Sequence, residues 1–294
     1  MGHSICSLYK QHLNRTALRG PSFFGNINRH YRAHWQFDFK ESNDSYKSLN
    51  YATAYEGVTP VSSTTLVHSE MALRLPLTLQ ELINRAMNKY VMEFIGTFFL
   101  VLTIGMSVIA GGSGVIPPLA IGSVLMVMVF AGGHISGGHY NPAVTLGVWM
   151  RGRTETKDVV PYMIFQTAGA LAAAAVVKYL APAAVVHPHV LAVFPALLAE
   201  FLFTFALVFV VINTAIAKGT SGNSFYGLAI GFTVLAGAFA MGNVTVGAFN
   251  PAVAVGVSVM GMVAWSQLWV FLVANFLGGA AAALTFKFLC PNDK

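Results

Sequence analysis

Two stretches of the sequence decide its fold, His134-Ile-Ser-Gly-Gly-His-Tyr-Asn-Pro-Ala-Val144 and Gly247-Ala-Phe-Asn-Pro-Ala252. Each contains the triplet Asn-Pro-Ala, and the second copy follows the first by 109 positions. The same offset relates Leu119-Ala-Ile-Gly122 to Leu228-Ala-Ile-Gly231. A constant offset between separate motifs indicates that the chain contains an internal repeat.

The composition around these motifs is that of a membrane protein. Hydrophobic residues make up 55% of the 294 positions, charged residues make up 10%, and the mean hydropathy is +0.64. These values exclude a disordered chain, a nucleic-acid module and an ordinary soluble enzyme. A helix of roughly 20 apolar residues crosses a hydrocarbon core of about 30 Å. The sequence therefore predicts six spanning helices, within the apolar runs 90–110, 119–133, 159–180, 191–217, 225–241 and 265–289.

The spans divide the chain into two parts. Residues 1–86 form an N-terminal extension that we expect to be flexible and cytoplasmic, and residues 87–294 form the membrane domain. Within that domain, repeat 1 covers about 87–182 and repeat 2 about 191–290. Three crossings per repeat invert the second copy relative to the first. Basic residues precede the first span and follow the second, fourth and sixth, so the positive-inside rule places both termini in the cytoplasm.

The residues after each asparagine predict two short helices that enter the membrane without crossing it. Proline suits the first turn of a helix, and asparagine just before it is a favoured N-cap. Because the repeats are inverted, the two half-helices are expected to meet with their N-termini together near the membrane centre. The non-helical backbone before each one, at 137–140 and 246–249, must line a wet cavity because lipid cannot satisfy its polar groups.

The two quoted stretches resemble the signature loops of the aquaporin, or major intrinsic protein, family, and the resemblance extends over about residues 87–290. It implies an all-α membrane protein of six transmembrane helices and two re-entrant half-helices in an inverted repeat. It also implies a homotetramer with one pore per subunit, in the plasma or inner cell membrane. The expected partners are the lipid bilayer and small neutral solutes. The sequence suggests no nucleic acid, cofactor, metal or catalytic group.

The resemblance also implies roles for individual residues. The motifs Asn141, Pro142, Ala143 and Asn250, Pro251, Ala252 would meet in the pore, where the two amides donate hydrogen bonds to a solute. Glu93 and Glu200, which are 107 positions apart, would brace the loops before the motifs. The pore backbone and its support would comprise Gly137, Gly138, His139, Tyr140, Ala248 and Phe249. Gly122 and Gly231 are predicted to lie where two helices cross closely.

The expected selectivity filter departs from the family pattern. That filter combines an aromatic residue, often a histidine, and an arginine just after the second Asn-Pro-Ala. Counting from the motifs without gaps places these positions at Ile121, Ala238, Gly247 and Val253. A filter of these residues is expected to be wider and apolar.

The sequence predicts a passive channel for water and for small neutral solutes such as ammonia, hydrogen peroxide, urea or glycerol. Protons and ions would be excluded at the paired asparagines. Two alternatives stay open at this point. A secondary transporter built from inverted repeats would need titratable groups near the midplane. A non-conducting structural membrane protein would keep the same fold without flux.

Overall fold

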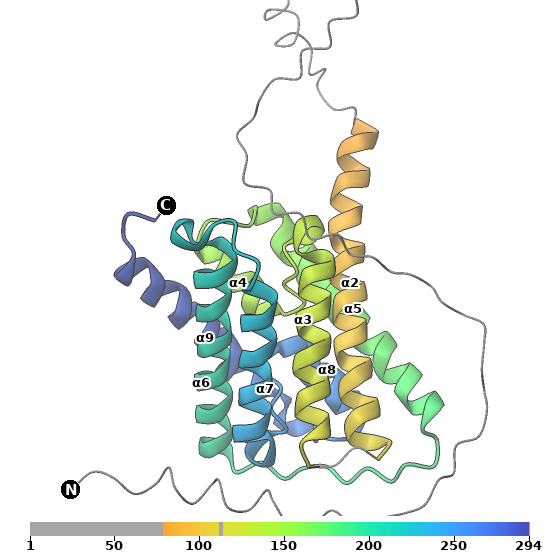
Figure 1. Cartoon of the computed structure of the whole chain (residues 1–294). Helices are drawn as coiled ribbons and strands as arrows, with labels where there is room; N and C mark the ends of the chain where they lie inside the picture. The colour runs from red at the N-terminus through yellow and green to blue at the C-terminus, as the bar shows by residue number, and fades with distance from the viewer. Residues whose placement is uncertain (1–78, 112–113, 294) are drawn as a thin grey trace, which may run out of the picture. The chain divides into compact units, whose positions relative to one another are not determined.

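The computed structural model describes residues 79–111 and 114–293, so most of the predicted N-terminal extension lies outside the described residues. The described part is helical (Figure 1). Its elements are α2 (Leu79–Ile109), α3 (Ile116–Ser136), α4 (Pro142–Met150), α5 (Thr156–Leu180), α6 (Val193–Val211), α7 (Tyr226–Thr245), α8 (Pro251–Val259) and α9 (Leu268–Leu289). A π-helical turn, Ile212–Ile216, continues α6, and short 3-10 turns lie at Lys218–Thr220 and Trp265–Gln267.

Six of these helices are long and apolar enough to cross a membrane, which confirms the predicted number of spans. They are α2, α3, α5, α6, α7 and α9, and their apolar portions are 20 to 25 residues long. The two remaining helices, α4 and α8, have nine residues each and are too short to span. The fold is therefore the predicted arrangement of six spanning helices and two half-helices.

The first of the described spanning helices, α2, is longer than its apolar run. It starts at Leu79 and continues without a break to Ile109, so the division of the chain at residue 86 falls inside α2. A helix can continue beyond the apolar run because its backbone hydrogen bonds do not depend on lipid. The functional separation of the N-terminal extension from the membrane domain stays a prediction.

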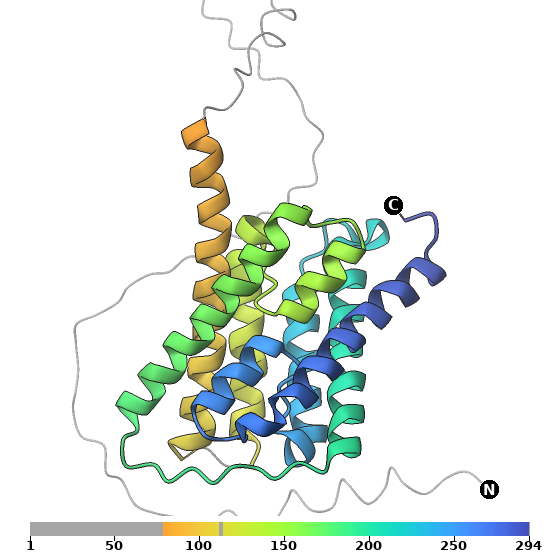
Figure 2. The same ribbon diagram turned by 180° about the vertical axis from the view of Figure 1, so that it is seen from behind.

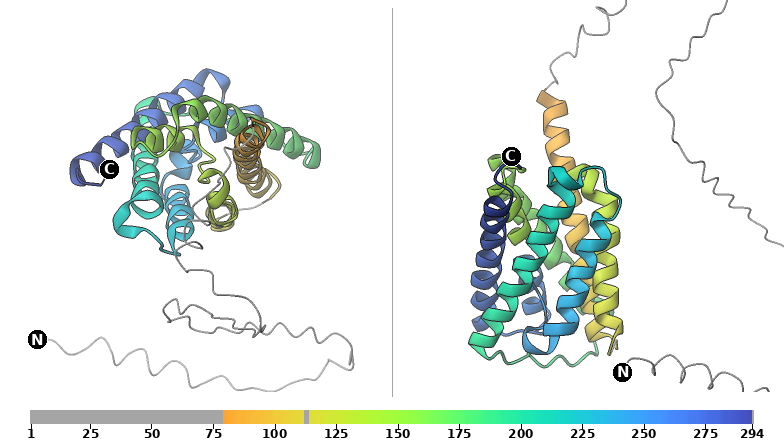
Figure 3. Two further views of the ribbon diagram at one scale, coloured as in Figure 1. Left: turned by 90° about the horizontal axis from the view of Figure 1, so that it is seen from above. Right: turned by 60° about the vertical axis from the view of Figure 1, so that its left-hand side comes forward.

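The two repeats interlock through their short helices. In the first repeat α2 packs against α5, and in the second α6 packs against α9 in the same way. Each half-helix also packs against the last helix of the other repeat, because α4 contacts α9 and α8 contacts α5. Figure 2 shows α4 and α8 between the tilted helices α5 and α9. Figure 3 shows α3, α6 and α7 side by side on the other face.

A close crossing of α3 and α7 joins the repeats on that face. A Cβ atom added to Gly122 would lie 2.8 Å from the carbonyl oxygen of Gly231, and one added to Gly231 would overlap the carbonyl oxygen of Gly122. Only glycine permits this approach, which confirms the crossing predicted from the repeated Leu-Ala-Ile-Gly motif. The crossing fixes the two helices that supply Ile121 and Ala238.

Candidate functional site

The two asparagines cap the half-helices in nearly identical conformations. Asn141 has φ −158° and ψ 119°, and Asn250 has φ −160° and ψ 116°. The Asn141 side-chain oxygen accepts hydrogen bonds from the backbone N–H groups of Ala143, at 2.8 Å, and Val144, at 3.5 Å. Asn250 does the same for Ala252 and Val253, at 2.9 and 3.3 Å. This confirms the predicted caps and fixes each amide nitrogen at the tip of its half-helix.

The amide nitrogens join the two half-helices. Asn141 Nδ2 donates to the carbonyl oxygen of Phe249 at 2.9 Å, and Asn250 Nδ2 donates to that of Tyr140 at 2.8 Å. Each residue thus binds the backbone that precedes the other motif. A side-chain amide carries two N–H donors, so one donor of each asparagine is left for a solute. No motif or offset in the sequence indicates this exchange of bonds.

The backbone before each motif turns through left-handed conformations. Positive φ angles occur at Gly137, Gly138 and Tyr140 in the first loop, and at Val246, Gly247 and Phe249 in the second. Tyr140 and Phe249 hold φ angles of 50° and 48°, which are uncommon for residues other than glycine and cost of order 1–3 kcal/mol each. The surrounding contacts must therefore hold both residues in place.

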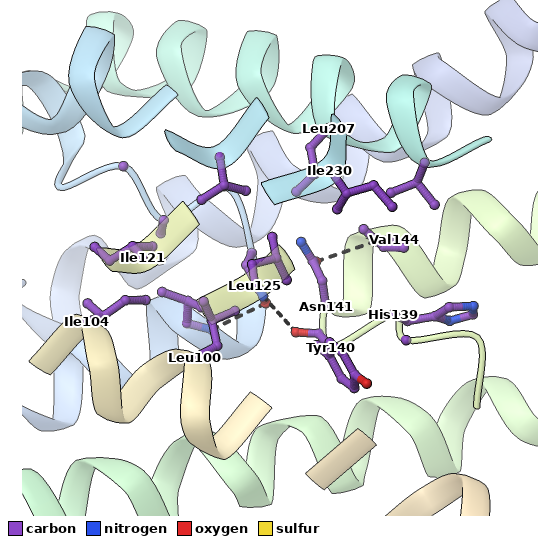
Figure 4. Close-up of a pocket in the computed structure, with 17 residues that line it drawn as sticks. Leu100, Ile104, Ile121, Leu125, His139, Tyr140, Asn141, Val144, Leu207 and Ile230 are labelled. Atoms are coloured by element: carbon purple, nitrogen blue, oxygen red, sulfur yellow. Dashed lines mark hydrogen bonds between the residues drawn. The ribbon is translucent and has the colours of Figure 1, made fainter. Parts of the chain in front are cut away.

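Aromatic packing provides part of that hold. The Tyr140 ring fills a recess so close to Gly96 and Gly132 that a Cβ atom on either glycine would overlap it. The Phe249 ring packs on Gly237, with its centroid 5.3 Å from that of Phe203. The Tyr140 carbonyl oxygen accepts from Asn250, and Figure 4 shows the Tyr140 ring extending away from the cavity. Buried rings thus anchor the loops, and the backbone faces the central path.

Two fully buried carboxylates, those of Glu93 and Glu200, also hold the loops before the motifs in place. Glu93 Oε1 accepts from Ser136 Oγ at 2.6 Å and from the N–H of His139 at 3.0 Å, and its Oε2 accepts from the N–H of Tyr140 at 2.6 Å. Glu93 therefore holds both the end of α3 and the loop after it. A buried carboxylate satisfied by several donors is the arrangement that can keep its charge away from water.

Glu200 repeats this bracing in the second half. Its Oε1 accepts from Thr245 Oγ1 at 2.7 Å and from the N–H of Ala248 at 3.0 Å, and its Oε2 accepts from the N–H of Phe249 at 2.7 Å. The donors stand at the same places in the loop as those around Glu93. The geometry is that of the loop brace that the family resemblance implies.

One bracing residue was missed in the sequence. Gln166 on α5 is fully buried, and its Nε2 donates to Glu93 Oε2 at 2.7 Å and to Thr145 Oγ1 at 3.0 Å. Thr145 Oγ1 also lies 3.1 Å from His139 Nδ1. A glutamine within an apolar run, with Asn275 at its repeat position 109 residues later, was the signal that could have identified it.

Three cavities follow one another through the bundle and share lining residues. The first has about 450 Å³ and carries no charged side chain in its lining; we call it the neutral vestibule. The last has about 260 Å³ and includes Lys89, Arg153, Glu155 and Asp158; we call it the charged vestibule. Between them lies a narrow segment of about 20 Å³, lined by both asparagines (Figure 4). A cavity of that size holds about one water molecule at a time.

The four filter positions lie together at one end of the narrow segment. Ile121, Gly247 and Val253 line both this segment and the neutral vestibule, whereas Ala238 lines the vestibule alone. His139 and Val211 line both the narrow segment and the charged vestibule at the opposite end. Apart from His139 and the asparagines, the side chains that line the narrow segment are apolar or belong to residues that contribute backbone.

Comparison with known proteins agrees with this geometry. The family described as Major intrinsic protein matches residues 83–286, and the chain belongs to that family. The solved structure of the aquaglyceroporin from Plasmodium falciparum matches with a TM-score of 0.61 and 20% identity, covering 70% of this chain and 98% of that one. At this identity the match concerns the fold alone.

Individual relatives share more of the sequence. The chain is 36% identical over 218 residues to the "Glycerol uptake facilitator protein-like 6" of Lactiplantibacillus plantarum, covering 70% of this chain and 100% of the relative. It is 35% identical over 228 residues to an "Aquaporin Z" of Rhodopseudomonas palustris, covering 70% and 94%. It is 34% identical over 209 residues to the "Aquaporin NIP1-4" of Oryza sativa, covering 67% and 75%.

Proposed function

We propose that this chain forms a passive transmembrane pore for water and small neutral solutes, which excludes ions and protons at the paired asparagines. The observation that carries the proposal is the narrow segment, in which the tips of two half-helices and their amides face a path whose other lining side chains, apart from His139, are apolar or belong to residues that contribute backbone. The relatives are named as aquaporins and as a glycerol facilitator, which are proteins of the same kind.

Exclusion of protons follows from the hydrogen bonds at the centre. A water molecule beside Asn141 and Asn250 accepts a bond from the second N–H of each amide, so its own hydrogens point outward along the path. This orientation interrupts the donor–acceptor chain along which a proton would hop. The N-terminal dipoles of α4 and α8 add a positive potential at the same point, which opposes cations. No Asp or Glu side chain lines the narrow segment to offset that potential.

Passage of solutes other than water depends on the filter positions. Ile121, Ala238, Gly247 and Val253 offer neither a charge nor a side-chain hydrogen-bond donor. Ammonia, hydrogen peroxide, urea and glycerol are the solutes that we propose, because each is neutral and carries groups that can bind the asparagine amides. The pore is expected to reject charged solutes, which would lose their hydration without gaining a partner.

The alternatives have less support from the geometry. A coupled transporter needs midplane groups that bind and release an ion, but the carboxylates of Glu93 and Glu200 are already occupied by loop donors. A non-conducting protein of the same fold would be expected to fill the space between the half-helices with side chains. The narrow segment instead joins two wider cavities.

We also propose the setting in which the pore works. The charged vestibule would face the cytoplasm, in accord with the positive-inside rule, and the neutral vestibule the outside. The chain would be a homotetramer in the plasma or inner cell membrane, with one pore in each subunit. Residues 87–294 would form the channel domain.

Osmotic measurement on the purified full chain tests the proposal. Proteoliposomes are mixed with an impermeant osmolyte, and their shrinkage is followed by light scattering beside protein-free vesicles. We expect faster shrinkage with the protein, and an unchanged rate when a proton gradient is imposed. Shrinkage no faster than in protein-free vesicles would contradict the channel function. Solute uptake that follows the proton gradient would favour the transporter instead.

A further inference from the structure

The volume of the path falls between the neutral vestibule and the segment that contains the asparagines. The neutral vestibule holds about 450 Å³ and reaches all four filter positions, whereas the narrow segment, which three of those positions also line, holds about 20 Å³. Four large side chains line the narrow segment and neither vestibule: Leu100, Leu125, Leu207 and Ile230. We call these four residues the collar. They come from α2, α3, α6 and α7, and Figure 4 shows them around Asn141.

We propose that the collar, and not the filter positions, sets the size of the largest solute that the pore passes. This inference rests on the proposed pore function and assigns its size limit to particular residues. Gly247 and Ala238 together present a single methyl group, so the filter positions leave space that the larger collar side chains occupy. The exposed fractions of the collar residues are 3 to 5%, so these side chains are packed in place.

The repeat supports the same assignment. Ile121 has Ile230 as its repeat counterpart, Gly247 has Gly138, and Val253 has Val144, each at the 109-residue offset. Three of the four filter positions thus carry the same residue as their counterparts in the other half. The arginine position at that end of the narrow segment therefore holds the same valine as the first repeat, and only Ala238 differs from its counterpart, which is Val129.

The position of the collar affects which solutes the pore selects. In this pore the tightest point and the strongest hydrogen-bond donors coincide, because the collar surrounds the asparagines. A solute must therefore fit between the collar side chains while it binds the amides. Linear neutral molecules, which present one polar group at a time, are favoured over branched molecules of equal volume.

A matched pair of variants tests the proposal. Ile121→Ala and Ile230→Ala make the same substitution at repeat-equivalent positions, one at the filter and one in the collar. Glycerol and water permeabilities of reconstituted full-length protein are measured by stopped-flow light scattering. We expect Ile230→Ala to raise the glycerol-to-water ratio about tenfold, which corresponds to about 1.4 kcal/mol in barrier height, and Ile121→Ala to change it by less than about twofold.

The outcomes separate this inference from the channel function. Wild-type protein without osmotic water flux would refute the proposed function itself. If water flux is intact, an equal or larger rise for Ile121→Ala, or no rise for either variant, would overturn the collar assignment. If removing the Ile230 side chain prevents folding, Leu207→Ala replaces it, and the same rise in the ratio is expected.

Discussion

Replacing Glu200 with glutamine changes one atom of the brace beneath the second half-helix. The amide oxygen of the new side chain can take the place of Oε1 and accept from Thr245 and Ala248. Its NH₂ group then stands where Oε2 accepts from the N–H of Phe249 at 2.7 Å. Two donors face each other there, so the Phe249 N–H loses its acceptor inside the protein.

The cost follows from that single lost bond. A buried donor left without an acceptor costs about 1–3 kcal/mol. Phe249 holds an uncommon φ angle of 48°, so the loop is expected to relax to a less strained conformation once this hydrogen bond is lost. Since Asn141 donates to the Phe249 carbonyl, relaxation would also displace the amide at the pore centre. A change of 1.4 kcal/mol shifts such an equilibrium about tenfold, so we expect a clear loss of water permeability per folded protein.

The equivalent change in the first repeat provides the matched comparison. In Glu93→Gln the amide oxygen can stand at Oε2 and accept from Tyr140 and Gln166, while the NH₂ group at Oε1 donates to the Ser136 hydroxyl and faces the N–H of His139. One backbone N–H is then left without an acceptor, as in Glu200→Gln, so we expect about 1–3 kcal/mol of destabilisation for each variant.

Thermal unfolding in detergent measures the stability of the two variants, and stopped-flow shrinkage of proteoliposomes gives their permeability. Both variants are expected to unfold at a lower temperature than the wild type and to conduct less water. Wild-type stability of both variants, or wild-type water flux in both, would refute this expectation.

Further predictions concern packing, the filter and the C-terminus. Gly231→Ala should destabilise by about 1–3 kcal/mol because its Cβ overlaps a backbone oxygen of α3, whereas Gly242→Ala on the same helix meets no atom within 4 Å and should be neutral or slightly stabilising in thermal unfolding. Val253→Arg should reduce glycerol or urea flux more than water flux in stopped-flow assays, because a long cation then occupies the filter. Asp293→Asn should lower the free energy of unfolding by up to about 3–5 kcal/mol, because it breaks the 2.6 Å ion pair that Asp293 makes with buried Arg151. Thermal unfolding measures this change, and a stability equal to that of the wild type would show that the ion pair is dispensable.

Most of the fold could be predicted because its determinants are repeated or long. Six apolar runs give six spans, and two Asn-Pro-Ala triplets at one offset give two half-helices in an inverted repeat. The starts and ends of the helices follow less directly from the sequence. Helix α2 begins at Leu79, well before the apolar run from residue 90, because helical hydrogen bonding continues outside the bilayer. Hydrophobicity in the sequence therefore indicates which residues face lipid, but it does not indicate the residue at which a helix begins.

The site was predictable only where one repeat could be read against the other. Glu93 and Glu200 stand out as paired charges in apolar helices, and the structure gives both the same bracing bonds. The bonds from Asn141 to Phe249 and from Asn250 to Tyr140 depend on how the two halves meet in space, which no offset in the sequence specifies. Gln166 was missed because its role requires Glu93 and Thr145 to converge from separate elements.

The symmetry of the lining has a further implication for how this pore selects. With valine at position 253 matching Val144, the side chains on either side of the asparagines are nearly the same, and the main exception is His139 opposite Ala248. Similar side chains at both mouths of the narrow segment give little basis for a filter at one of them. The two mouths differ instead in what they open into, since Ile121 borders the neutral vestibule whereas Ile230 borders neither vestibule. We therefore expect selection to act where the two repeats meet, which is the level of the asparagines and the collar.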